Sequence, residues 1–368
     1  MRIGIVTFHF VNNFGGALQA YALQRAIQAN CDAEAVVVDY QNLFIRFTDT
    51  IRLLPITSNV KEFFSGWKSM YSRFERLDKF KKFLTENLQL TNRYYNQASL
   101  KRNPPDCDKF VCGSDQIWNT AITFVLAEPY FLTFEQESSN KFSYAPSFGN
   151  NQIKARYEKK MAHYIGELNQ ISVRESDGVE LAERLTGRQA IQLIDPVFLL
   201  TQEEWSEIAV TPSINVPYIL LYIMQRDENV YNYAKQIKKR LGIKLIEISR
   251  YGYKPDFVDV SLINIGPAEF LGLFQNAAYV CTNSYHGLSF SLLFSKEFCF
   301  VPCKRFSSRI TSLFTLLDIE LPEANNPYLA KSVVYDKTMI KKIICSERQK
   351  SITYLQKNIC GERTASYD

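Results

Sequence analysis

Residues 3–40 read IGIVTFHFVNNFGGALQAYALQRAIQANCDAEAVVVDY. The runs from Ile3 to Phe8 and from Ala35 to Tyr40 are almost uniformly apolar, which is typical of strands buried on both faces of a parallel sheet. Between them, Asn12 to Gly16 indicates a turn, and Ala17 to Ala29 repeats apolar residues at helical spacing. This strand–turn–helix–strand order predicts a doubly wound α/β fold.

The same alternation returns further along the chain. We expect strands at 109–112, 140–145, 171–174, 192–194, 218–224, 244–248, 278–282 and 297–301, and helices at 177–185, 228–241, 267–276, 285–294 and 337–356. Residues 1–200 should form one Rossmann-like domain with an aromatic and basic helical insert at about 44–100, and residues 201–368 a second one with a C-terminal helix. The predicted fold class is therefore α/β, with two Rossmann-like domains facing a cleft and ligands beyond the carboxyl ends of the strands.

Composition narrows the functional class. Of the 368 residues, 46% are hydrophobic and 22% charged, as in globular proteins. The net charge of +5 is mild and Lys and Arg are not densely clustered, so we expect no nucleic-acid partner. The eight cysteines form no CxxC pair, which argues against a metal site. No signal peptide or membrane span is visible, so we expect a cytoplasmic protein with reduced thiols.

The segment 44–84 combines aromatic side chains with a basic surplus. It holds nine basic and four acidic residues, an excess of five. Its large apolar side chains recur at helical spacing and would share one broad face; they are Phe63, Phe64, Trp67, Met70, Tyr71 and Phe74. Two interpretations stay open. The face packs on the first domain, or it lies in an anionic membrane interface as a peripheral contact.

Two turns in the first domain are candidate binding sites. One precedes the first helix, where glycine lets the backbone approach a ligand and free N–H groups are available. The other follows the strand at 109–112 and supplies polar groups for sugar hydroxyls and a flat Trp face for a sugar ring. The residues are Asn13, Gly15 and Gly16 in the first turn, and Ser114, Asp115, Gln116 and Trp118 in the second. A plain turn and a helix cap beside a packed Trp are the alternatives.

Two further segments carry ionisable groups at strand ends. Arg174 ends the strand at 171–174 and has the planar fork that binds carboxylate and phosphate, unless it forms only a surface pair with Glu175. His286 lies in TNSYHGL, between a predicted buried strand and an apolar helix. Of the three histidines, His9, His163 and His286, the last is the best candidate general acid or base, because a helix N-terminus binds anions and a His exchanges protons.

Six stretches form an ordered set along the chain: VNNFGGALQAYALQ (11–24), FVCGSDQIWN (110–119), SYAPSFG (143–149), SVRE (172–175), DPVFLL (195–200) and TNSYHGLSFSLLF (282–294). In this order they resemble the polysaccharide pyruvyl transferase family, from Ile3 to about Leu317. The resemblance implies a fold similar to GT-B glycosyltransferases. It also implies phosphoenolpyruvate as the donor, a sugar pyruvate ketal as the product, and no further cofactor.

The resemblance also assigns roles to single residues. It implies His286 as the acid and a donor site formed by Arg174, Arg309, Asn283 and Ser284. The chain departs from the family where many members have an Arg two residues before the His, because Ser284 stands there. Arg309 takes the place of a Lys. The acceptor would be a sugar of a surface polysaccharide or of its lipid-linked precursor. One alternative is a nucleotide-sugar glycosyltransferase of the same fold. The other is a non-catalytic glycan-binding protein, which is favoured by the presence of Ser284 where many members have an Arg.

Overall fold

The N-terminal half forms a four-stranded parallel sheet. The computed structural model describes residues 1–51, 67, 69–149, 152–224, 226–249, 254–301, 308–320 and 333–361. In the first sheet the strand order is β2 (Glu34–Val37), β1 (Arg2–Val6), β3 (Lys109–Cys112) and β4 (Lys141–Ser143). All three pairings are parallel, as the uniformly apolar strand sequences predicted.

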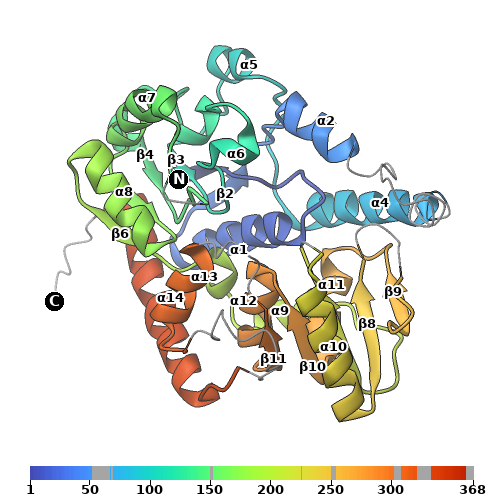
Figure 1. The fold of residues 1–368 in the computed structure, drawn as a ribbon. Helices are drawn as coiled ribbons and strands as arrows, with labels where there is room; N and C mark the ends of the chain where they lie inside the picture. Colours follow the sequence, from blue (N-terminus) through green and yellow to red (C-terminus); the bar gives the residue numbers. More distant parts are fainter. Residues whose placement is uncertain are drawn as a thin grey trace.

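Helix α1 (Phe14–Asn30) packs against this sheet and lies between it and the second half of the molecule (Figure 1). Its start is fixed by Asn13, whose side chain accepts a hydrogen bond from the Gly15 N–H. Residues along almost all of its faces are buried, because elements of both halves cover it. The loop before α1 is thereby held at the junction of the two halves.

A smaller unit completes the first half. The strands β5 (Ile171–Val173) and β6 (Ala190–Gln192) pair in parallel around α8 (Ser176–Thr186), and α7 (Ala155–Gly166) packs on α8. The remaining short helices are α5 (Gln97–Arg102), α6 (Thr120–Thr123), η1 (Glu128–Phe131), η2 (Ser138–Asn140), η3 (Pro196–Phe198) and α9 (Gln202–Glu207).

The second half holds a five-stranded parallel sheet. Its strand order is β11 (Glu297–Phe300), β10 (Tyr279–Thr282), β7 (Tyr218–Tyr222), β8 (Lys244–Ile248) and β9 (Val260–Leu262). The helices of this half are α10 (Glu228–Leu241), α11 (Pro267–Asn276), α12 (Tyr285–Leu293) and α13 (Ser308–Leu316). The predicted helices at 228–241 and 267–276 are confirmed at both ends.

The insert contains two helices within the described residues, α2 (Leu43–Ile51) and α4 (Met70–Asn87). Phe80 and Phe83 of α4 are buried and contact aromatic rings of α1. Trp67, Tyr71 and Phe74 are 52%, 75% and 56% exposed. More than half of each of these side chains is therefore exposed, although the later turns of α4 pack on α1. Phe63 and Phe64, also predicted for this face, lie outside the described residues.

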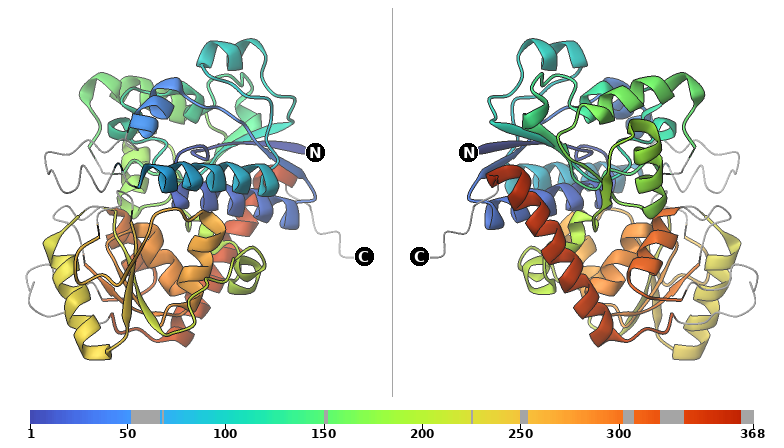
Figure 2. Two further views of the ribbon diagram at one scale, coloured as in Figure 1. Left: turned by 90° about the vertical axis from the view of Figure 1, so that its right-hand side faces the viewer. Right: turned by 90° about the vertical axis from the view of Figure 1, so that its left-hand side faces the viewer.

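The last helix, α14 (Lys337–Cys360), runs from the second half back to the first (Figure 2). Tyr354 donates its hydroxyl to the carbonyl of Ser143 at the end of β4, and Arg348 donates to the carbonyl of Phe198. The predicted α/β class with two Rossmann-like units is confirmed. None of the helices in the described part of the chain is long and apolar enough to cross a membrane.

Candidate active site

His286 lies in the first turn of α12, directly after β10. Ser284 caps this helix by accepting a hydrogen bond from the N–H of Gly287, so the imidazole stands at a helix N-terminus beyond a strand end. The ring is 7% exposed, and its Nε2 has no hydrogen-bond partner among the described residues. Burial lowers the pKa of His286 below its ordinary value, although Asp195 and Asp115 act in the opposite direction.

Gly15 of α1 lies directly against the His286 ring, across the junction of the two halves. A Cβ atom on Gly15 would lie 2.0 Å from Nδ1 of His286, which is far inside van der Waals contact. A Cβ on Gly16 would meet nothing closer than 3.5 Å. Of the two glycines predicted to admit a ligand, Gly15 thus makes room for the His286 side chain of the other half. Asn13 contributes as the helix cap described above.

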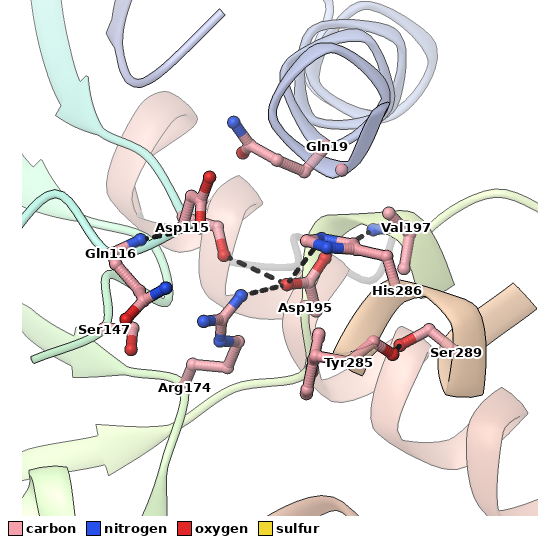
Figure 3. A network of polar contacts seen from close by, with 12 residues as sticks. Gln19, Asp115, Gln116, Ser147, Arg174, Asp195, Val197, Tyr285, His286 and Ser289 are labelled. Carbon is pink, nitrogen blue, oxygen red and sulfur yellow. Dashed lines mark hydrogen bonds and ion pairs between the residues drawn. The ribbon is translucent and has the colours of Figure 1, made fainter. Parts of the chain in front are cut away.

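Asp195 lies between Arg174 of the first half and His286 of the second, and it was not among the residues predicted for the site. It follows β6, and its Oδ1 accepts a hydrogen bond from the N–H of Val197 at the start of η3. Its Oδ2 accepts from Nη1 of Arg174 at 2.5 Å and lies 4.0 Å from Nε2 of His286 (Figure 3). The sequence signal for it is the Asp-Pro pair at the end of a strand, within the DPVFLL stretch of the family pattern.

Arg174 is buried together with Glu175, so the surface-pair alternative is wrong. Its Nε donates to Glu175 and its Nη1 to Asp195, which leaves Nη2 without a hydrogen-bond partner among the described residues. The guanidinium carbon lies 4.6 Å from the centre of the Tyr285 ring. Two of its nitrogens therefore bind protein carboxylates, and only the third is available to a ligand. This differs from the predicted bidentate clamp.

Arg309, near the start of α13, approaches the same aromatic ring. Its guanidinium carbon lies 5.8 Å from the centre of the Tyr285 ring, and its Nε is buried without a hydrogen-bond partner in the described structure. Burial and the neighbouring Arg174 both lower the pKa of Arg309. A buried polar nitrogen without a partner is costly, and such an atom is available to a ligand. Three of these nitrogens, Arg174 Nη2, Arg309 Nε and His286 Nε2, form a cluster, since their side chains lie close enough to interact electrostatically.

The turn after β3 supplies part of the predicted polar lining. Ser114 is fully buried and donates to Oδ2 of Asp195 at 3.4 Å. Asp115 has a φ of +68°, an uncommon backbone conformation for a residue other than glycine. Gln116 is half-buried, and its N–H donates to the carboxylate of Asp115. Sequence reasoning thus grouped these residues correctly around one turn, and the structure brings Asp115 close enough to interact electrostatically with His286.

Trp118 is a correction. The prediction gave its face to a sugar ring, but the side chain is 2% exposed and stacks on Phe131 at 5.5 Å. Its indole N–H donates to the carbonyl of Tyr130. An indole that is buried with its N–H satisfied is a core residue. The alternative of a packed Trp beside a helix cap is the one observed, since Asn119 caps α6.

The two polar residues before His286 hold the strand-to-helix junction. Asn283 accepts a hydrogen bond from the N–H of Met224 beyond β7, and Ser284 is the cap of α12. These two contacts are structural, while the position of both residues puts them beside the candidate acid. Among the described residues, no group of three or more His, Cys, Asp and Glu side chains is arranged to hold a metal ion.

The arrangement combines a His that can exchange a proton with two guanidinium groups that can hold an anion.

Solved structures of similar shape include a UDP-GlcNAc 2-epimerase from Neisseria meningitidis bound to UDP-GlcNAc, with 11% identity, coverage of 98% of this chain and 94% of that one, and a TM-score of 0.44. Another is the Streptomyces glycosyltransferase SsfS6 with thymidine diphosphate, with 12% identity, 97% and 98% coverage, and a TM-score of 0.44. No curated protein sequence matches the chain. The family model described as polysaccharide pyruvyl transferase matches residues 13–305, which include every site residue named above except Arg309. The chain belongs to the polysaccharide pyruvyl transferase family.

Proposed function

We propose that this protein transfers a pyruvyl group from phosphoenolpyruvate to a sugar of a surface polysaccharide or of its lipid-linked precursor, forming a pyruvate ketal. The observation that carries the proposal is the cluster of three buried nitrogens without partners, on Arg174, Arg309 and His286. Phosphoenolpyruvate offers a carboxylate and a phosphate to the guanidinium groups, and a methylene carbon that can accept a proton from the His.

The proposed reaction needs one acid and cationic groups that stabilise anions. Nε2 of His286 gives a proton to the methylene carbon, and positive charge develops at the carbon that bears the phosphate. A sugar hydroxyl attacks that carbon, and its proton returns to the imidazole of His286, which is neutral after the first step. The carbon–oxygen bond to phosphate breaks, a second hydroxyl of the sugar attacks the same carbon and closes the ketal, and its proton leaves with the inorganic phosphate. Arg174 and Arg309 would hold the donor's anionic groups throughout.

Incubation with phosphoenolpyruvate and lipid-linked glycans tests this proposal. Release of inorganic phosphate together with a pyruvyl mass gain on the glycan is expected. Parallel incubations with nucleotide sugars test the glycosyltransferase alternative. Turnover of a nucleotide sugar without any phosphoenolpyruvate consumption would reject the proposal, and glycan binding without turnover of any donor would favour the non-catalytic alternative.

Changing Arg309 to Gln should weaken donor binding by about tenfold or more, because a charge-assisted hydrogen bond to an anion is lost. Arg174→Lys should weaken donor binding by a smaller factor than Arg309→Gln. Lys keeps the positive charge that Glu175 and Asp195 need, but it lacks the planar fork of Arg. Calorimetric titration with phosphoenolpyruvate measures the effect. Arg184→Gln is the matched control, because Arg184 forms an exposed ion pair with Glu158 on the surface. Equal donor affinity in all three variants would reject the donor clamp.

We also propose that the protein acts in the cytoplasm, at the inner face of the membrane, through exposed apolar side chains of the insert. Phe44 and Phe47 on α2 are 51% and 62% exposed, and the Phe44 ring contacts the exposed Phe124 beyond α6. Two separate segments thus share one apolar surface. Lys79, which could have faced an anionic bilayer, is instead paired with Glu269, while Lys81 and Lys82 are exposed.

The double variant Phe44→Ser, Phe47→Ser should bind anionic vesicles about tenfold or more weakly, because two aromatic side chains no longer enter the interface. Co-sedimentation with vesicles at low and high salt measures this. Val210→Ser is the control, since Val210 is equally exposed but belongs to a different part of the molecule. Equal sedimentation of both variants and the unmodified protein would count against this contact.

A further inference from the structure

Arg76 is a buried cation at the junction of the two halves of the molecule. It lies on α4, is 5% exposed, and its guanidinium carbon stands 4.6 Å from the centre of the Phe14 ring and 5.7 Å from that of Phe80. Its Nε donates to Oδ1 of Asn12 at 2.9 Å, and its Nη1 lies 3.4 Å from the carbonyl oxygen of Ser249. Burying a guanidinium is expensive, so its partners are informative.

Those partners belong to opposite halves. Asn12 is part of the loop that leads into α1 and ends at Gly15, whereas Ser249 follows β8 of the second sheet. Further contacts of α4 lie nearby: Lys79 pairs with Glu269 of α11 at 2.6 Å, and Glu75 accepts a hydrogen bond from Asn264. Helix α4 therefore contacts both halves, and Arg76 bonds both to the loop before α1 and to the chain just after β8 of the second sheet.

The same loop lies directly against His286, the candidate acid. Phe14 stacks on Phe270 of α11 at 4.4 Å, and the next residue, Gly15, leaves no room for a Cβ atom against the His286 ring. His286 belongs to the second half, so its surroundings depend on how closely this loop of the first half approaches it. A side chain that bonds to both the loop and the second half therefore sets the distance between the loop and His286.

We propose that Arg76 is a positioning residue, which holds the Asn12–Gly15 loop against His286 by bonding to both halves of the molecule. The inference deepens the proposed function, because it concerns the same site. Arg76 itself does not touch His286 in any contact of the structure described above. Its effect on the reaction passes through the loop, and it should change the surroundings of the His rather than the binding of the donor.

The test uses Arg76→Met, which keeps apolar contact with Phe14 and Phe80 but removes both hydrogen bonds. Lys82→Met is the matched control, because Lys82 lies on the exposed face of the same helix. The groups around His286 are Asp195, Asp115, Arg174 and Arg309, and all are kept in both variants. A loosened loop admits water to the ring, so the pKa of His286 should rise toward its ordinary value in Arg76→Met.

Histidine NMR titration measures this without any activity, and the three histidines are assigned from single variants. We expect an upward pKa shift in Arg76→Met and none in Lys82→Met, with turnover lowered about tenfold or more and donor affinity kept. If Arg76→Met does not fold, Asn12→Ala removes the same bond from the other side. An unchanged His286 titration in both Arg76→Met and Asn12→Ala would overturn the inference. A shifted titration in a protein that consumes no phosphoenolpyruvate would instead reject the proposed function and leave this inference standing.

Discussion

Changing His286 to Ala should lower turnover by about a hundredfold or more while the protein stays folded, because the proposed proton donor is lost. His163→Ala is the matched control, since His163 is exposed on α7 and takes no part in the site. Steady-state turnover with phosphoenolpyruvate and the acceptor measures both variants, with circular dichroism as a check of folding. Near-normal turnover in a folded His286→Ala protein would remove His286 from the mechanism.

The pH dependence of the unmodified enzyme tests the same assignment. A proton donor must be protonated, and burial shifts the pKa of His286 downward in the free enzyme. The value of kcat/KM, which reports the free enzyme, should therefore fall as pH rises through a value below 6.5. A bound donor with negative charges favours the imidazolium, so kcat should fall at a higher pH than kcat/KM. If kcat and kcat/KM fell at the same pH, or if either rose with pH, the role of His286 as an acid would be contradicted.

The fold was predictable because its signals are local. Uniformly apolar strands and amphipathic helices follow from periods of two to four residues, and helices such as α10 start and end at the predicted residues. His286 could also be found locally, since it follows a buried strand and begins an apolar helix. Arg174 and the turn at Ser114 could be named as candidates in the same way, but their meeting with His286 could not be predicted, because they follow β5 and β3, far from α12 in the sequence.

Two residues show what local reasoning lacks. Trp118 and Asp195 both stand just after a strand, beside polar or capping residues. The structure buries Trp118 in the core and places Asp195 between Arg174 and His286. The difference depends on partners from distant parts of the sequence, which are Phe131 and Phe148 for Trp118, and Arg174 and His286 for Asp195. Neither is recorded in the spacing of nearby residues.

The contact between Gly15 and His286 allows a test in which a single methyl group should disable the enzyme. Both Gly15 and Gly16 lie in the first turn of α1, where Ala is the better helix former by about 1 kcal/mol. In Gly15→Ala the new Cβ would overlap the imidazole at 2.0 Å from Nδ1, so the ring or the loop must shift by an ångström or more. A misplacement of about 1 Å at a reacting group costs roughly a hundredfold in rate.

Gly16→Ala is the matched control, because its nearest contact is an ordinary 3.5 Å and the helical preference for Ala acts equally. We expect Gly15→Ala to lose about a hundredfold in turnover and Gly16→Ala to stay within about threefold of the unmodified enzyme. Thermal unfolding of both variants separates a local displacement from a loss of the fold. Because the clash lies between α1 of the first half and α12 of the second, full activity in Gly15→Ala would mean that the two halves do not meet at His286 during the reaction.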